Sequence, residues 1–248
     1  MADIRGLLFD KDGTLLDYAA SWAPINRQAA RLAAAGDLVL TERLLIAAGV
    51  DPATDLAAAD SLLAAGNTAE IATAWAEGGS PYDAERLTRD LDALFHSAAT
   101  SVVPVTDLAA LFRRYKARGL KLGIASSDNA ASIAATARHF GIDGMLDFIA
   151  GYDSGHGVKP EPGMVAAFCR ATGLPPAEVA MIGDNTHDLA MGRAAGAGLT
   201  IGVLTGTGSR ATLSPLADLC LGSILEIEAA LWGSEDVDAH MRSGEDRA

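Results

Sequence analysis

The chain has 248 residues, of which half are hydrophobic and 21% are charged, and its formal net charge is −13. This composition suits one domain with a large insertion or two modest domains, and it excludes a largely disordered chain. The acidic balance argues against nucleic acids and anionic membrane surfaces as partners, because both require a basic protein surface.

The cysteines and the apolar runs indicate the compartment. Cys169 and Cys220 are far apart and form no CxxC pair, so we expect two reduced thiols. The first apolar stretch is too short for a signal peptide and runs directly into Asp10. No apolar run has the length that a membrane span requires. We therefore expect a cytoplasmic protein without a membrane segment.

The first hundred residues combine one strand with a helical segment. Residues 3–10 have the continuous apolar pattern of a buried strand. From about residue 17 to 103, alanine and leucine recur at helical spacing and glycines separate the repeats. The clearest expected helices span 26–35, 41–48, 68–76 and 83–98. We interpret residues 18–100 as an all-helical module inserted after the first strand.

From Pro104 onward, predicted helices and strands alternate. After the cap Thr106-Asp107, we expect a helix to about 118, a strand at 120–125, a helix at 129–140, a strand at 148–150, a helix at 162–172, a strand at 179–182, a helix at 186–195 and a strand at 199–203. This alternation predicts an α/β fold, a Rossmann-like parallel sheet covered on both faces. Residues 1–17 and 101–232 would form this core, and the charged residues 233–248 a flexible tail.

Acidic and hydroxyl side chains follow the predicted strands, where parallel sheets bind ligands. Asp10 and Asp12 end the first strand two residues apart, so both carboxylates can face one centre. Two such anions need a cation to coexist, although an acidic turn after an edge strand has the same pattern. Ser126, Ser127 and Asp128 follow the second strand, as a phosphate site or as an ordinary helix cap.

The later strand ends continue the pattern. Lys159 is one of only four lysines and stands between glycines and prolines, although a lone loop lysine is usually just solvated. Asp184 ends the fourth strand, and Asp188 lies one helical turn later on the same face. Both acids could instead cap the following helix, and His187 is interpreted as a residue of that helix start.

The ordered set of motifs resembles the haloacid dehalogenase superfamily, in its phosphatase branch with a helical cap after the first motif. Residues 10–14 match its DxDGT signature, Ser126 its second-motif hydroxyl, Lys159 with the flanking prolines its third motif, and residues 183–188 its GDxxxD element. The resemblance extends from residue 4 to about 221 and is strongest to the phosphoglycolate phosphatase group. Asn185 and Ser127 are mild departures from the usual residues, and the cap matches no known motif.

The resemblance implies roles for these residues. Asp10 would be the nucleophile, and Asp12 the acid for the leaving group and then the base for water. Mg²⁺ would be held by Asp10, the backbone carbonyl of Asp12 and Asp184, with Asp188 acting through water. The substrate phosphoryl group would be bound by Thr14, Ser126, Ser127 and Lys159. Trp22, Asn26 and Arg27 are candidates for leaving-group contacts or, equally, for cap packing.

The expected function is magnesium-dependent hydrolysis of a small phosphorylated metabolite, with 2-phosphoglycolate as the best candidate. A dehalogenase would need neither Asp12 nor Asp184, and a phosphonate hydrolase would need a cap lysine, which residues 12–115 lack. A phosphomutase shares all the core residues and stays an alternative, as does a non-catalytic metabolite-binding module. The expected assembly is a monomer or a homodimer.

Overall fold

The computed structural model describes residues 3–233, and its centre is a parallel sheet. The six strands lie in the order β3-β2-β1-β4-β5-β6, and each neighbouring pair is parallel. The predicted α/β fold class is therefore confirmed. The strands are β1 (Gly6–Phe9), β2 (Lys121–Ala125), β3 (Phe148–Ala150), β4 (Val179–Gly183), β5 (Leu199–Val203) and β6 (Leu219–Leu221).

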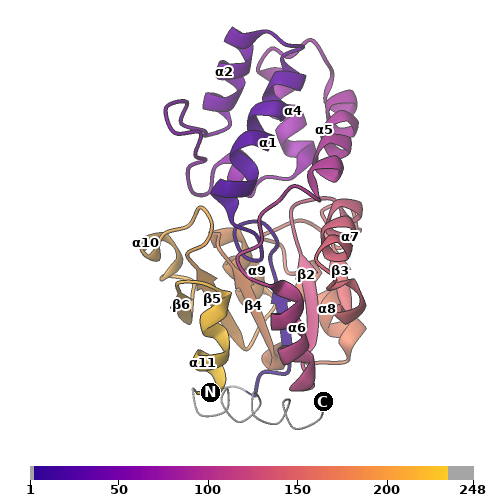
Figure 1. The fold of residues 1–248 in the computed structure, drawn as a ribbon, viewed down its shortest axis with the longest axis vertical. Coiled ribbons are helices and arrows are strands. Elements are labelled where there is room, and N and C mark those ends of the chain that lie inside the picture. The colour runs from indigo at the N-terminus through magenta and orange to yellow at the C-terminus, as the bar shows by residue number, and fades with distance from the viewer. Residues whose placement is uncertain (1–2, 234–248) are drawn as a thin grey trace.

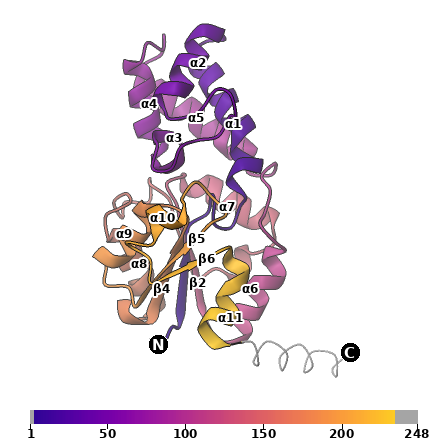
Figure 2. The same cartoon turned by 90° about the vertical axis from the view of Figure 1, so that its left-hand side faces the viewer.

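Helices cover both faces of this sheet (Figure 2). Alternate residues of β1 point to opposite faces, so Leu7 and Phe9 enter one core and Leu8 enters the other. The first core contains side chains of α6 (Leu108–Ala117), α7 (Ala130–His139) and α11 (Ile227–Trp232), and the second those of α8 (Gly163–Thr172) and α9 (Thr186–Ala194).

A separate group of helices stands at the carboxyl end of the strands (Figure 1). We call it the cap. Its helices pack around their own apolar core, which includes Trp75, Leu87 and Leu91. They are α1 (Tyr18–Ala33), α2 (Leu38–Ala47), α3 (Leu62–Ala65), α4 (Thr68–Glu77) and α5 (Ala84–Ala98).

The two chain segments that join the cap to the sheet run side by side. The backbone N–H of Asp17 donates to the carbonyl of Val103 over 2.9 Å, and that of Val105 donates to Leu15 over 3.0 Å. These paired segments tie the start and the end of the cap to one point above β1. The predicted domain boundaries stay a prediction, although the cap helices lie between β1 and α6.

Short elements account for most differences between expectation and structure. The sequence pattern did not predict α3, β6, α11 or α10 (Arg210–Leu213), which have three to six residues each. Helix α1 begins at Tyr18, earlier than the expected residue 26, because Asp17 caps it and it continues through Pro24. The predicted flexible tail lies outside the described residues, apart from Gly233.

Two smaller findings concern the cysteines and the hydrophobicity of the helices. Cys169 and Cys220 are both free thiols, the former buried and the latter partly buried. Between residues 3 and 233, the helices lack the combination of length and hydrophobicity that crossing a bilayer requires.

Candidate active site

The predicted site residues converge where the chain leaves the central strands. Asp10 directly follows β1, and Asp184 directly follows the adjacent strand β4. The backbone N–H of Asp10 donates to Ile182 over 2.8 Å, which extends the pairing of the two strands and fixes the start of the acidic loop. The strand order reverses between these neighbours, and open α/β sheets bind ligands at such a point.

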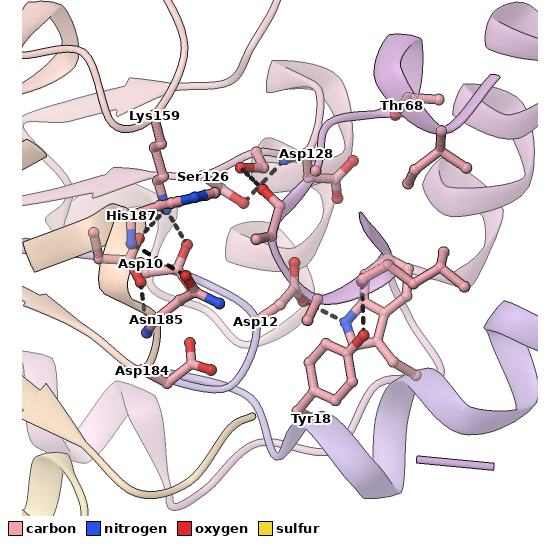
Figure 3. A pocket seen from close by; sticks show the side chains of 18 of the residues that line it. Asp10, Asp12, Tyr18, Thr68, Ser126, Asp128, Lys159, Asp184, Asn185 and His187 are labelled. Atoms are coloured by element: carbon pink, nitrogen blue, oxygen red, sulfur yellow. Dashed lines mark hydrogen bonds and ion pairs between the residues drawn. The ribbon is translucent and has the colours of Figure 1, made fainter. Parts of the chain in front are cut away.

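Three carboxylates form a buried cluster at this point, and Figure 3 labels two of them, Asp10 and Asp184. Asp10, Asp184 and Asp188 are each at most 6% exposed, and one carboxylate oxygen from each lies within 4.8 Å of the others. The ammonium group of Lys159 donates to Asp10 and, over 2.6 Å, to Asp188. The structure thus brings together four residues that the sequence placed on three separate segments.

The buried charges perturb one another. Burial raises the pKa of Asp10 to about 7, against the opposing effect of Lys159. Burial, followed by the charges of Asp10 and Asp188, raises the pKa of Asp184 well above its usual value. Burial by itself lowers the pKa of Lys159, but the carboxylates of Asp10 and Asp188 outweigh it and raise that pKa. One ammonium group for three carboxylates leaves an excess of negative charge.

The cluster fits a hard divalent cation. Carboxylate oxygens are the ligands that Mg²⁺ and Ca²⁺ prefer, and a bound cation would offset the excess negative charge. The backbone N–H of Thr207 orients Asp184 by donating to its Oδ2 over 2.9 Å. Glycine at position 206 permits this approach, since a Cβ there would lie 1.9 Å from the same oxygen.

Asp188 caps the following helix, which is one of the two roles that the sequence left open, and it also contacts Lys159. Its Oδ2 accepts from the backbone N–H of Asn185 over 3.1 Å and completes a capping box at the start of α9. Its Oδ1 accepts from Lys159. The predicted action of Asp188 on a metal through water stays a prediction.

The side chain of Asp12 lies in a different network from the carboxylate cluster. Lys11 is buried and its ammonium group lies 2.8 Å from Asp12 and 3.1 Å from Asp128. The indole N–H of Trp22, which comes from the cap, donates to Asp12 Oδ1 over 2.7 Å. A cation from the core and a neutral donor from the cap therefore fix this carboxylate.

The hydroxyl residues take three different positions. Ser126 is 2% exposed and lines the pocket, and its Oγ accepts from the backbone N–H of Asp128, which leaves its proton for a ligand. Ser127 also lines the pocket, and its hydroxyl donates to Ala65 of the cap over 3.1 Å. Thr14 is fully buried and its hydroxyl lies 3.5 Å from Asp184, so it supports the cluster from outside the pocket lining. The predicted substrate contacts of all three stay predictions.

One pocket joins the core site to the cap. Its core wall includes both networks of aspartates, and Trp22 and Asn26 of α1 contribute to its cap wall. Arg27, the third cap residue singled out from the sequence, pairs with Asp55 and does not line this pocket. The full lining is Asp10, Asp12, Tyr18, Trp22, Asn26, Leu63, Ala64, Ala65, Gly66, Thr68, Ile71, Phe95, Ser126, Ser127, Asp128, Lys159, Asp184, Asn185, His187 and Asp188.

Comparison with known proteins identifies the family. A model of haloacid dehalogenase-like hydrolases matches residues 4–196, which include every member of the carboxylate cluster. The chain belongs to the haloacid dehalogenase-like hydrolases. It is an enzyme of that family, and the family resemblance seen in its motifs is confirmed.

Relatives and solved structures of haloacid dehalogenase-like hydrolases cover most of the chain. A phosphoglycolate phosphatase from Shigella boydii is 28% identical over 226 residues, which span 81% of this chain and 82% of the relative. A haloacid dehalogenase family hydrolase from Deinococcus radiodurans, solved with bound phosphate and sodium, is 26% identical with a TM-score of 0.62, over 93% and 96% of the two chains. CbbY from Rhodobacter sphaeroides, in complex with phosphate, has a TM-score of 0.69 at 20% identity, over 90% and 96%.

Some residues of this hydrolase's site were absent from the predictions. Lys11 occupies the variable position of the DxDGT signature between two aspartates, so apart from the scarcity of lysine nothing in the sequence marked it as a buried residue. Thr207 stands in a Thr/Gly-rich stretch after β5, which is a weak turn signal. His187 was read as a helix-start residue, but it also lines the pocket, with its Nδ1 buried and unpartnered.

Proposed function

We propose that the protein is a magnesium-dependent phosphatase that hydrolyses a small phosphorylated metabolite through an aspartyl phosphate on Asp10. The observation that carries this proposal is the position of Asp10. Its carboxylate is held by Lys159, belongs to the three-carboxylate cluster and lines the pocket. A nucleophile, a fixed positive charge and a cation site thus meet at one point, as phosphoryl transfer requires.

In the first half-reaction, a carboxylate oxygen of Asp10 attacks phosphorus and the bond from phosphorus to the ester oxygen breaks. Lys159 provides positive charge beside Asp10, and Ser126 donates its hydroxyl proton to a phosphoryl oxygen. Asp10, Asp184 and the backbone of Asp12 would hold Mg²⁺, with Asp188 behind a water. When bound, Mg²⁺ supplies neutralisation of the phosphoryl charge.

Asp12 would be the general acid of the first half-reaction and the general base of the second. It gives a proton to the departing ester oxygen, and it then takes one from the water that attacks the phosphorus of the aspartyl phosphate. Its side chain lines the pocket and lies outside the metal cluster, which suits this role. Lys11 and Trp22 orient it before the substrate arrives.

We expect Trp22→Phe to lower kcat/KM about ten- to hundredfold, because a hydrogen bond to a charged group contributes about 1.5–3 kcal/mol. Phenylalanine keeps an aromatic ring against Phe95, whose centroid lies 5.2 Å from that of Trp22, and removes the donor to Asp12. Hydrolysis of p-nitrophenyl phosphate measures the loss. Phe95→Leu is the control for packing and for the pocket lining, since it alters both without touching Asp12. Equal losses in both variants would show that the indole N–H does not matter.

Two observations on relatives support phosphoryl chemistry and one candidate substrate. The Deinococcus radiodurans hydrolase and CbbY are described with bound phosphate, and the Shigella boydii relative is a phosphoglycolate phosphatase. These relatives make 2-phosphoglycolate the first metabolite to assay. We propose a cytoplasmic location, in line with the two free cysteines.

The test of this function is release of inorganic phosphate from p-nitrophenyl phosphate and from a panel of phosphorylated metabolites. We expect turnover with Mg²⁺ and none after treatment with a chelator. A transferred phosphoryl group that reappears on another substrate position, instead of in solution, would identify a phosphomutase. Binding of metabolites without turnover would identify a binding module.

We expect Asp184→Asn to abolish the thermal stabilisation that Mg²⁺ gives to the wild type. At a hundredfold excess over its dissociation constant, a metal adds about 2.7 kcal/mol, or about 5–10 °C in Tm for a chain of this size. The variant should lose this gain, and it should unfold at a higher temperature than the wild type when both are metal-free, because it removes one of three crowded, buried carboxylates. Thermal unfolding with and without Mg²⁺ measures both effects. An unchanged magnesium response would remove Asp184 from the cation site.

A further inference from the structure

The cap wall of the pocket carries no charge. It consists of ten residues from α1, the segment around α3, and helices α4 and α5, and none of them is acidic or basic. They are Tyr18, Trp22, Asn26, Leu63, Ala64, Ala65, Gly66, Thr68, Ile71 and Phe95. Since the phosphoryl group would lie at Asp10 on the core wall, the rest of the substrate would face these neutral side chains.

Apart from the Mg²⁺ of the proposed function, which the carboxylate cluster would hold, the core wall adds negative charge and little positive charge. Among residues 3–233, five aspartates line the pocket against one lysine, Lys159, which already pairs with Asp10 and Asp188. The second buried lysine of the site, Lys11, pairs with Asp12 and Asp128 and is not part of the lining. A carboxylate on the leaving group would therefore lie near Asp12 and Asp128, and no lysine of the lining would be free to pair with it.

Three side chains of the cap wall already donate hydrogen bonds within the protein. The indole N–H of Trp22 donates to Asp12, and the Tyr18 hydroxyl donates to the carbonyl of Leu63 over 2.7 Å. Since the Tyr18 proton is used, Asn26 must turn its amide nitrogen to the Tyr18 oxygen, as observed over 3.5 Å. This leaves Asn26 Oδ1, a buried acceptor without a partner. A wall with a spare acceptor does not favour a carboxylate.

Apolar surface dominates the same wall. Tyr18 stacks on Trp22 with centroids 6.4 Å apart, and Phe95 packs edge-on against Trp22. Leu63 and Ile71 lie in the same lining and are at most 7% exposed. Such a surface favours a ligand with an apolar face, because burying that face removes apolar area from water.

We infer that the pocket selects phosphate monoesters whose leaving group is uncharged and carries an apolar face, and that it discriminates against a leaving group with a carboxylate. This inference rests on the proposed phosphatase function and names its substrate class. It predicts that 2-phosphoglycolate, the substrate of the named Shigella boydii relative, is a poor substrate here.

Two basic side chains near the cap wall support the competing hypothesis, that the pocket binds a leaving group with a carboxylate. Arg27 follows Asn26 on α1 and is paired with Asp55, with both side chains 40% exposed. His187 lines the pocket from α9. If either residue bound a carboxylate, the selectivity would be the reverse of the one inferred.

The experiment compares matched esters that differ only in the carboxylate. The pairs are 2-phosphoglycolate with 2-hydroxyethyl phosphate, and 4-carboxyphenyl phosphate with 4-(hydroxymethyl)phenyl phosphate. We expect kcat/KM to favour the uncharged member of each pair at least about tenfold, from the unpaired charge beside two aspartates. Equal values, or a preference for the carboxylates, would overturn the inference.

Binding separates this inference from the proposed function. Calorimetry of the same four esters with the Asp10→Asn variant measures selectivity of binding without turnover. If the wild type hydrolysed none of the esters, the proposed phosphatase function would fail, and the binding data would still test the selectivity of the pocket. We expect the uncharged esters to bind more tightly. Arg27→Gln and His187→Gln should leave the ratio within each pair unchanged. If either variant bound the carboxylate ester more weakly and the uncharged ester as before, the replaced residue would be the cation that pairs with the carboxylate, and the inference would be overturned.

Discussion

The Asp10→Asn variant should lose turnover by about 10⁴-fold or more, the scale on which removal of a covalent nucleophile acts. The substitution keeps the volume of the side chain and removes the attacking oxyanion. Lys159 keeps its ion pair with Asp188, so the fold should persist. Phosphate release from p-nitrophenyl phosphate measures the loss, and acid quenching followed by mass spectrometry should detect a phosphorylated peptide containing Asp10 in the wild type alone.

Asp147→Asn is a matched control for the loss of a paired aspartate. Asp147 accepts from Lys116 over 2.7 Å and from Lys121 over 3.0 Å, and these contacts lie outside the pocket. We expect this variant to keep its turnover. Activity of Asp10→Asn within tenfold of the wild type, or a phosphoryl group found on another residue, would show that Asp10 is not the nucleophile.

Much of the fold and of the carboxylate cluster was predictable because it depends on local patterns. Strands β3 and β5 have the expected bounds, because each short apolar run is followed within three residues by a glycine, Gly151 or Gly206, that ends the strand pattern. Asp10 and Asp184 each follow such a strand, and the carboxyl ends of parallel strands share one edge of the sheet. Their convergence with Lys159 therefore follows from topology that the alternation of helices and strands already implies.

Contacts between the cap and the core were not predictable in the same way. The hydrogen bond from Trp22 to Asp12 depends on the direction in which α1 leaves the sheet, and the sequence of the nine intervening residues does not define that direction. Within the cap, the pairing of Arg27 with Asp55 depends likewise on the fold of the segment between α2 and α3. Elements as short as α3 and β6 are stabilised by tertiary packing more than by their own sequence.

The Asp12→Ala variant gives the most specific test of the mechanism. If Asp12 protonates the leaving oxygen, its loss should matter less when the leaving group is already a weak base. We expect a loss of roughly 10²–10⁴-fold on an alkyl phosphate and a much smaller loss in the first step on p-nitrophenyl phosphate. The aspartyl phosphate should accumulate with the activated ester, because its hydrolysis then lacks a base. Rapid quenching and measurement of protein-bound phosphate detect this accumulation.

Asp128→Asn controls for disruption of the ion-pair network around Lys11. Asp128 shares Lys11 with Asp12, and its replacement disturbs the same buried charges without removing the proposed acid and base. Asp128→Asn should slow hydrolysis of both esters by the same factor, and the aspartyl phosphate should not accumulate. If Asp12→Ala behaves in this way too, Asp12 only positions its neighbours. If Asp12→Ala is unaffected on either ester, Asp12 is neither the acid nor the base of the reaction, and the case for phosphoryl chemistry with an acid and base at this position fails.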